Sequence, residues 1–466
     1  MSIIEELEKE YRAKHPKSKQ LYEMALNFYA SGVSHDGRFA RPFPIYATEA
    51  RGTRKWDVDG NEYVDYVMGH GALLFGYGDE RVLEELKRQI PKALHMGACT
   101  ELEIEWAELI KKLVPSAKNG LVRATSCGSE AVQMAIRLSR NYTGRDKIVI
   151  QAGAYHGKQD VTIYARGAPP IGVYNVRGIP KGVTDDVIIV PFNDLEAVEK
   201  ALKSGEVACV ILHCNALYTR EYIEGLRELT SRYGAVFLMD EVVSGFRYSA
   251  GGAQEYYGVT PDLTAIGKVI GGGAPVGAVC GMKEILDLYS FKDDHWNRFV
   301  RVAVGGTWNA QPITIAGGIA MLRAIDAERD RIYKCLNDTG RRLANAFNEM
   351  AEDRGLAALA YGLPVDDPTT ISINLFNRPV PPDKEYLWHT GPTSFEDYTT
   401  KSGFYASRQA NHATYLSMTN NGVYSYSGRG GSLCTKYTEE DLEITERAFD
   451  ATLGVLKEND LVGRVV

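Results

Sequence analysis

Between about residue 75 and residue 285 the chain alternates short apolar runs with longer amphipathic stretches, and this alternation restricts the fold more than any other feature. The apolar runs are rich in Val, Ile and Leu: KIVIQ, DVIIVPF, ACVILH, AVFLMD and VGAVCG. Continuous apolar strands of this kind are buried on both faces of a sheet. The stretches between them have helical periodicity, as in TELEIEWAELIKKLV and SEAVQMAIRLSRNY. We therefore expect an α/β fold with a mainly parallel central sheet.

The sequence on either side of this region suggests three parts. A charged amphipathic helix at MSIIEELEKEYRAKHPKSK and a β-hairpin at ARGTRKWDVDGNEYVDY occupy an N-terminal segment, residues 1–74. The large domain with the central sheet is expected at 75–325, and a smaller α+β C-terminal domain at 326–466. Residues 378–404 are rich in Pro, Thr and Lys and are predicted to be a surface insertion.

The composition argues against several functional classes. A net charge of −7 and a pI of about 5.8 give no basic footprint for nucleic acid. The seven cysteines include no CxxC pair and the nine histidines no HExxH, so neither a disulfide framework nor a metal site is expected. No apolar stretch reaches the ~18 residues that a membrane span needs. The N-terminus does not look like a signal peptide, so we expect a cytoplasmic protein.

Ligands of open parallel sheets bind at the carboxyl ends of the strands. In this sequence two chemically complementary residues follow predicted strands. Asp240 closes AVFLMD, and Lys268 closes LTAIGK before three glycines. A lysine amine forms a Schiff base with an aldehyde, and a carboxylate keeps a pyridine nitrogen protonated. The pair is therefore the minimum apparatus for pyridoxal 5'-phosphate (PLP) chemistry. An ordinary strand-end lysine that reaches for water is the alternative.

The cofactor phosphate would need a cradle, and TSCGSEAVQMAIRLSR offers a small-residue turn that opens an amphipathic helix. The turn consists of Ser126, Cys127, Gly128 and Ser129. Free N–H groups and the helix dipole bind anions at such a place, although a plain serine N-cap gives the same pattern. Thr307 in GGTWNAQP is a further candidate phosphate donor. Tyr155 follows a strand and either stacks on a pyridine ring or packs in the interior.

The segment FLMDEVVSGFRYSAGGAQEYYGVTPDLTAIGKVIGGGAPVGAVCG resembles the lysine region of class III PLP-dependent aminotransferases. The resemblance extends over nearly the whole chain, through WDVDGNEYVDY, TGRDKIV, YHG and TEEDLEITERAF. It is strongest with the branch that contains glutamate-1-semialdehyde 2,1-aminomutase, D-phenylglycine aminotransferase and β-phenylalanine aminotransferase.

This resemblance implies a type I PLP-dependent transferase fold, which is aspartate aminotransferase-like. Lys268 would hold PLP as a Schiff base and Asp240 would bind the pyridine nitrogen. Val242 and Tyr155 would lie on the two faces of the ring. Gly128 and Ser129 would bind the phosphate together with the partner subunit's Thr307, so a homodimer is expected.

Two arginines are candidates for binding a substrate carboxylate, which suits the fork of a guanidinium. GVSHDGRF matches a segment that carries such an arginine in the resembled branch, and this falls on Arg38. In GVYSYSGRGGSLCTKYT the candidate is Arg429, where the resembled aminomutase has a glutamate. The D-phenylglycine enzyme has a GGRGS-like stretch there, and its GHGAL matches Gly69–Leu73. A surface arginine is the alternative at Arg38.

The chain also departs from the resembled family near the cofactor. The usual Asn-Ser-Gly-Thr turn is Ser-Cys-Gly-Ser at 126–129, and the usual Glu-Pro after the strand at 208–212 is replaced by His213 and Cys214. We predict an aminotransferase that acts between a carboxylate-bearing amino acid, aromatic or cyclic, and a keto acid. The alternatives are intramolecular transfer, as in the aminomutase, and a catalytically silent binding protein with the PLP fold.

Overall fold

The computed structural model describes residues 2–163, 178–214, 218–377, 406–425 and 428–464. The predicted insertion at 378–404 lies outside the described residues. The described part of the chain divides into two compact units. One unit takes its residues from Met1–Asp79, Lys334–Asp383 and Lys401–Val466, and the other takes them from Glu80–Tyr333.

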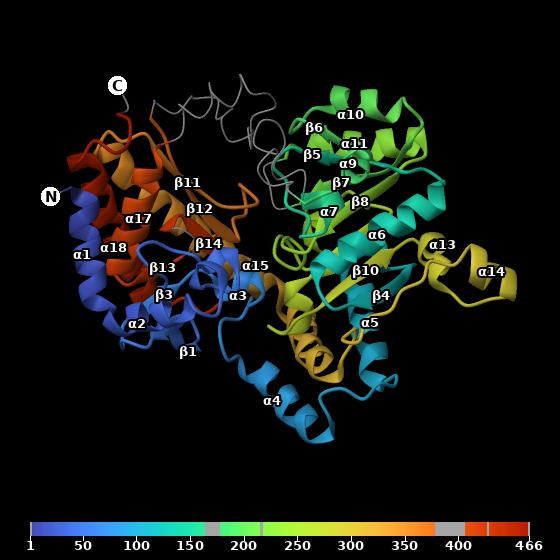
Figure 1. Ribbon diagram of the computed structural model, residues 1–466, viewed down its shortest axis with the longest axis horizontal. Coiled ribbons are helices and arrows are strands. Elements are labelled where there is room, and N and C mark those ends of the chain that lie inside the picture. The colour runs from blue at the N-terminus through green and yellow to red at the C-terminus, as the bar shows by residue number, and fades with distance from the viewer. Residues whose placement is uncertain (1, 164–177, 215–217, 378–405, 426–427, 465–466) are drawn as a thin grey trace. The chain divides into compact units, whose positions relative to one another are not determined.

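The described residues of the Glu80–Tyr333 unit form a seven-stranded sheet in the order β4-β10-β9-β8-β7-β5-β6 (Figure 1). The strands are β4 (Leu121–Thr125), β5 (Lys147–Gln151), β6 (Val187–Val190), β7 (Val207–His213), β8 (Val236–Glu241), β9 (Leu263–Gly267) and β10 (Gly277–Gly281). Neighbours from β9 to β6 pair in parallel, whereas β10 is antiparallel to both β9 and β4. The predicted α/β fold with a mainly parallel sheet is confirmed.

Helices connect these strands, much as the periodicity predicts. They are α4 (Glu80–Gln89), α5 (Glu101–Leu113), α6 (Gly128–Thr143), α7 (Asp160–Ile163), α9 (Lys181–Thr184), α10 (Leu195–Leu202), α11 (Arg220–Tyr233), α12 (Gly252–Tyr257), α13 (Lys283–Leu286), α14 (Asp294–Phe299) and the long α15 (Pro312–Asp353). The apolar face of α6, with Val132 and Ile136, packs into the core together with Ile211 of β7. Both α6 and α11 end at a left-handed glycine, the common helix C-terminus.

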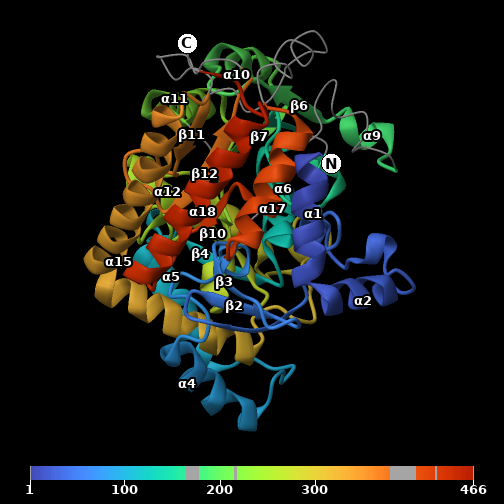
Figure 2. The ribbon, with the colours of Figure 1, turned by 90° about the vertical axis from the view of Figure 1, so that its left-hand side faces the viewer.

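The other unit contains two smaller sheets among its described residues. One comprises β1 (Ala47–Arg51), β2 (Arg54–Asp57), β3 (Glu62–Asp65) and β13 (Val423–Tyr424), and the other β11 (Ala358–Tyr361), β12 (Thr370–Leu375) and β14 (Gly430–Ser432). The helices of this unit outside α15 are α1 (Ile3–Lys14), α2 (Pro16–Ala25), α3 (Met68–Gly71), α17 (Arg408–Asn420) and α18 (Glu439–Glu458). Figure 2 shows α17 lying between α1 and α18.

The N-terminal helix is interrupted, which its charge pattern does not reveal. His15 is the C-cap of α1 and the N-cap of α2, and Pro16 begins α2 because proline is tolerated in the first turn. The His15 ring is buried and hydrogen-bonds to the Tyr11 carbonyl oxygen and the Tyr63 hydroxyl. No helix in the described ranges combines the length and the apolar character that crossing a membrane requires.

Candidate functional site

The two predicted catalytic residues lie at the carboxyl ends of neighbouring strands. Asp240 is the penultimate residue of β8, and Lys268 follows β9 as the first residue of the 3-10 turn η6 (Lys268–Gly271). The strands pair in parallel with Asp240 opposite Ala265. This register brings both polar side chains to one edge of the sheet, where ligands of such folds bind.

Lys268 has an unusual backbone conformation, and its amine has an unusually low pKa. Its φ of 49° lies in the left-handed region, which is uncommon for a residue other than glycine and is often found at functional sites. Burial lowers the pKa of Lys268 to about 8; the charge of Asp240 opposes this shift and that of Arg247 adds to it. A substantial fraction of the amine is therefore neutral near pH 8, and the neutral form is the nucleophile.

The Asp240 carboxylate is buried and held by two donors. Its Oδ2 lies 2.8 Å from Nδ1 of His156, and its Oδ1 accepts a hydrogen bond from the Val242 N–H at 3.1 Å. Burial by itself raises the pKa of Asp240, but the hydrogen bond from His156, the electrostatic interactions with His156 and His213 and the Val242 N–H together lower it below its usual value. The carboxylate is therefore ionised and suited to a cationic ring nitrogen.

The N-terminal end of α6 is open in the way an anion site requires. Cys127 is its N-cap and makes no side-chain capping bond, while the first N–H groups of a helix lack partners within it. A Cβ atom at Gly128 would lie 2.5 Å from Cγ1 of Val242, and one at Gly267 would lie 3.3 Å from the same atom. Glycine at 128 therefore brings this helix end against Val242, two residues beyond Asp240.

Ser126, predicted as a phosphate ligand, is engaged by Glu130 of the first helical turn. The Ser126 N–H and hydroxyl both donate to Glu130 Oε2, at 2.8 and 2.6 Å. Ser129 Oγ accepts a hydrogen bond from the Lys158 N–H at 3.4 Å. A cavity of about 790 Å³ adjoins this helix end. Its lining includes Ser126, Cys127, Ser129, Glu130, Arg137, Arg140 and Lys158.

Tyr155 and Thr307 belong to the same unit as Lys268. The Tyr155 side chain follows β5 and is 42% exposed, which leaves part of its ring accessible. Thr307 lies in an exposed segment, and its carbonyl oxygen accepts a hydrogen bond from His95 Nε2 at 2.6 Å. Its role across a dimer interface stays a prediction.

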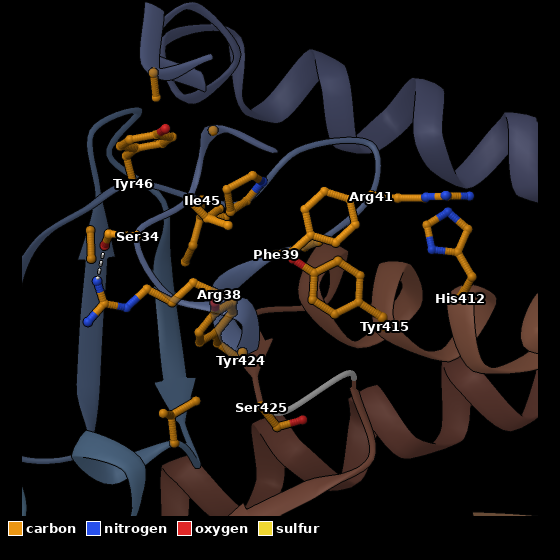
Figure 3. Close-up of a pocket in the computed structure, with 18 of the residues that line it drawn as sticks. Ser34, Arg38, Phe39, Arg41, Ile45, Tyr46, His412, Tyr415, Tyr424 and Ser425 are labelled. Atoms are coloured by element: carbon orange, nitrogen blue, oxygen red, sulfur yellow. Dashed lines mark hydrogen bonds between the residues drawn. The ribbon is translucent and has the colours of Figure 1, made fainter. Parts of the chain in front are cut away.

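Arg38 belongs to the other unit and lines a cavity of about 970 Å³ (Figure 3). Its Nη1 donates to Ser34 Oγ at 3.1 Å. The lining also includes the cations Arg41, Lys55 and Arg408 and the aromatic residues Tyr29, Phe39, Tyr46, Tyr415 and Tyr424. Within the described part of the chain, no Asp or Glu lines this cavity. A wall of cations and aromatic rings suits a carboxylate that carries a ring.

Arg429 lies in this same unit, just before β14, but does not line the Arg38 cavity among the residues described. Its Nε is buried and has no hydrogen-bond partner in the described ranges. Burial lowers the pKa of Arg429, and the interaction with Tyr361 opposes that shift. A buried donor without an acceptor is costly, so this guanidinium is suited to a carboxylate ligand.

Three residues of the site were not assigned roles from the sequence. His156 holds Asp240, and the YHG segment that follows a strand was its only signal. His213 stood out as a departure, and the structure pairs it with Asp240 across β7 and β8. Glu130 gave no signal in the sequence, because an acidic residue is common in the first turn of a helix.

Comparison with known proteins identifies the family of this chain. The family model for aminotransferase class-III matches residues 37–358. Glutamate-1-semialdehyde 2,1-aminomutase of Methanosphaera stadtmanae is 38% identical over 344 residues, which cover 72% of this chain and 78% of the relative.

Two solved structures are similar over nearly their full lengths. An ω-transaminase from Sphaerobacter thermophilus is 31% identical with a TM-score of 0.79, covering 94% of this chain and 97% of that one. A transaminase with PLP bound is 27% identical with a TM-score of 0.81, covering 96% and 99%. The chain therefore has the type I PLP-dependent transferase fold and belongs to the class III aminotransferases, a family of PLP-dependent enzymes.

Proposed function

We propose that this enzyme moves an amino group on a small carboxylate-bearing amino acid, using PLP held as a Schiff base on Lys268. The observation that carries the proposal is the partly neutral Lys268 amine at the strand edge that also holds the ionised Asp240. An amine that forms a Schiff base and a carboxylate that stabilises a cationic ring are the two groups this chemistry needs.

The described residues fit the cofactor. Gly128 sets the open end of α6 against Val242, so a phosphate on the helix end and a ring over Val242 are compatible with one bound molecule. Gly128 and Ser129 would hold the phosphate, Val242 and Tyr155 would flank the ring, and Asp240 would hold its nitrogen. Cys127 would contribute through its backbone. Ser126 would support the turn through Glu130 instead of donating directly.

When bound, PLP supplies an aldehyde that captures the substrate amine and a cationic ring that accepts electrons from the substrate carbon. Lys268 would hold the cofactor through its amine, and that amine, when free, would carry a proton away from the substrate carbon. Its depressed pKa suits it to act as a base near neutral pH. Asp240 would hold the ring nitrogen of the cofactor with a negative charge, since His156 and the Val242 N–H each hold one of its oxygens.

Intramolecular transfer, as named for the aminomutase, is the first candidate reaction. The curated relative with that name is 38% identical to this chain, whereas the transaminase structure reaches 31%. This similarity supports intramolecular transfer more strongly than the transfer between two molecules that the sequence favours.

Transfer between an amino acid and a keto acid is kept as the second candidate because of Arg429. In the segment where the resembled aminomutase has a glutamate, this chain presents the half-buried guanidinium of Arg429, whose Nε has no hydrogen-bond partner among the described residues. Reversing that charge changes which ligand the segment binds. The aromatic lining of the Arg38 cavity supports a ring-bearing carboxylate for this candidate.

A homodimer with a phosphate contact from the partner subunit's Thr307 is part of the proposal. A catalytically silent binding protein is the weakest alternative, since the chain keeps both Lys268 and Asp240. A cytoplasmic location stays a prediction.

Borohydride reduction of the PLP-loaded protein, followed by peptide mass spectrometry, tests the core of this proposal. An adduct on Lys268 is expected, and Lys268→Ala serves as the control. Absence of the adduct from the wild-type protein would overturn the proposal. Two assays then separate the candidates: conversion of glutamate-1-semialdehyde to its isomer with the amine on carbon 1, and release of a keto acid from amino acids in the presence of a keto-acid acceptor.

A further inference from the structure

We propose that His156 and His213 are positioning residues that fix the direction and charge of the Asp240 carboxylate. This inference rests on the function proposed above, in which Asp240 binds the ring nitrogen of PLP. His156 contacts Asp240, and His213 acts on the same carboxylate from the neighbouring strand and packs against the ring of His156. Neither imidazole is assigned a contact with the substrate.

The hydrogen bond between His156 and Asp240 determines which ring nitrogen carries the hydrogen. Nδ1 of His156 lies 2.8 Å from Oδ2 of Asp240, and the two side chains are 0% and 5% exposed. An ionised carboxylate only accepts hydrogen bonds, so Nδ1 must be the donor. With Oδ1 held by the Val242 N–H, the carboxylate has a donor on each oxygen and its rotation is restricted.

The other nitrogen of His156 completes this assignment. Nε2 is buried and has no hydrogen-bond partner in the described ranges. A hydrogen placed there would leave a buried donor unsatisfied, at a cost of about 1–3 kcal/mol. The geometry therefore favours the tautomer with its hydrogen on Nδ1, which is the one that Asp240 requires. The ring of His213 stands edge-on to this imidazole, with the ring centroids 5.5 Å apart and an interplanar angle of 86°.

Strand register explains why His213 reaches the same place. In the parallel pairing of β7 with β8, His213 is directly opposite Asp240, so both side chains project from the same face of the sheet. A carboxylate at position 213 would set two like charges on adjacent strands and disfavour the ionised form of Asp240. The imidazole of His213 has the opposite effect, because its electrostatic interaction with Asp240 lowers the pKa of that carboxyl.

Lys268, Arg247 and Glu241 are further charged groups around Asp240. Lys268, which follows β9, interacts with the charge of Asp240, and Arg247 acts on Lys268. Glu241, the next residue of β8, accepts hydrogen bonds from the backbone N–H groups of Ala253 and Gln254 at the start of α12. In the described part of the chain, the direct side-chain hydrogen bond to Asp240 comes from His156.

The test compares His156→Phe, His156→Asn and His213→Phe with the wild-type protein, all loaded with PLP. Phenylalanine keeps a ring but removes the nitrogen atoms, and the asparagine amide can replace the Nδ1–H donor. The control is His295→Phe, a change at an exposed histidine of α14. The measurements are the pH midpoint of the cofactor absorbance band and the rate at which PLP dissociates.

The expected direction follows from the ring nitrogen. If Asp240 is held less firmly, it stabilises the protonated ring nitrogen less. The ring then withdraws less electron density from the nitrogen of Lys268, so the pKa of that nitrogen rises. The pH midpoint of the absorbance band therefore moves to higher pH. We expect a rise of about 0.5 to 1 pH unit in His156→Phe, with about tenfold slower turnover, a smaller rise in His213→Phe, and a near-wild-type midpoint in His156→Asn. PLP dissociates faster in both phenylalanine variants.

The outcomes separate this inference from the proposed function. Unmoved midpoints in both phenylalanine variants, with PLP still on Lys268, would overturn the positioning role and leave the proposed function intact. A wild-type protein that carries no PLP on Lys268 would overturn the proposed function instead. If circular dichroism shows that His156→Phe does not fold, the test depends on His213→Phe. An unchanged absorbance midpoint in His213→Phe would then overturn the positioning role of both histidines.

Discussion

Gly128 packs so closely against Val242 that a Cβ atom at position 128 would lie 2.5 Å from the valine Cγ1. The contact joins the proposed phosphate-binding end of α6 to the residue two positions beyond Asp240. This packing would fix the distance between the groups that hold the phosphate and the ring of a bound cofactor. The glycine is therefore expected to matter for binding as well as for stability.

Gly128→Ala is expected to weaken PLP binding at least tenfold and to lower the free energy of unfolding by about 1–3 kcal/mol, the usual range for overpacking. The added methyl group has to displace either Val242 or the first turn of α6. PLP titration and urea unfolding measure the two effects. The double variant Gly128→Ala/Val242→Ala should recover part of the lost affinity, since it removes the clash but also shortens the side chain that would flank the ring.

Gly454→Ala in α18 is the matched control, because a Cβ atom there would meet nothing within 4 Å. Wild-type PLP affinity in Gly128→Ala would show that the end of α6 does not hold the phosphate.

Glu130→Gln is expected to tighten PLP binding about threefold to tenfold at low salt, because it removes a negative charge beside the phosphate. The glutamine oxygen can still accept the hydrogen bonds from Ser126, so the turn keeps its shape. Equilibrium dialysis at two salt concentrations measures the effect, which should shrink at high salt. Glu196→Gln, in the first turn of α10, is the control. Weaker binding in Glu130→Gln would place the phosphate elsewhere or assign the carboxylate a structural role.

The sequence alone was sufficient to predict the sheet and its two polar strand ends. The runs that became β5, β7 and β8 are apolar throughout, and this is a local property of the residues. Asp240 and Lys268 follow from the same pattern, because ligands of parallel sheets bind at the carboxyl ends of strands. Their assignment to PLP chemistry needed the resemblance to a family as well.

Specific side-chain contacts, both between distant segments and within a single turn, could not be predicted in this way. His213 acts on Asp240 because β7 lies next to β8, and strand order is not encoded in the periodicity of either strand. The sequence offers Ser126 as a phosphate ligand, whereas in the structure Glu130 Oε2 accepts hydrogen bonds from both the N–H and the hydroxyl of Ser126. The break at His15 depends on buried hydrogen bonds to Tyr11 and Tyr63, which no helical pattern reveals.

Lys268→Met is expected to raise the free energy of unfolding of the PLP-free protein by about 1–3 kcal/mol at pH 7 while abolishing activity. Burial lowers the pKa of Lys268 to about 8 in the folded chain, against an ordinary value of 10.5. Below pH 8 the folded state bears the full cost of the buried charge. Between pH 8 and 10.5 Lys268 loses its proton in the folded protein but keeps it in the unfolded protein. The free energy of unfolding of the wild type therefore rises with pH, and the difference between the wild type and Lys268→Met becomes smaller.

Urea unfolding of both proteins at pH 7 and pH 9.5 measures this difference. Lys111→Met on α5 controls for the loss of a lysine that lies outside the site. If the difference in the free energy of unfolding between the two proteins is the same at both pH values, Lys268 has an ordinary pKa in the folded chain.

Arg429→Met is expected to lower kcat/KM for carboxylate substrates about 100-fold, as the loss of a charged hydrogen bond predicts. Arg429→Met should convert the matching amine without a carboxylate at nearly the wild-type rate, because that amine has no carboxylate for the guanidinium to bind. Half-reaction rates with the two compounds, followed by cofactor absorbance, give the comparison, and Arg429→Lys should lie between the extremes because lysine lacks the fork. Arg447→Met, at an exposed arginine of α18, is the control. Equal losses for both compounds would mean that the half-buried Arg429 side chain supports the fold around β14 and does not bind the substrate carboxylate.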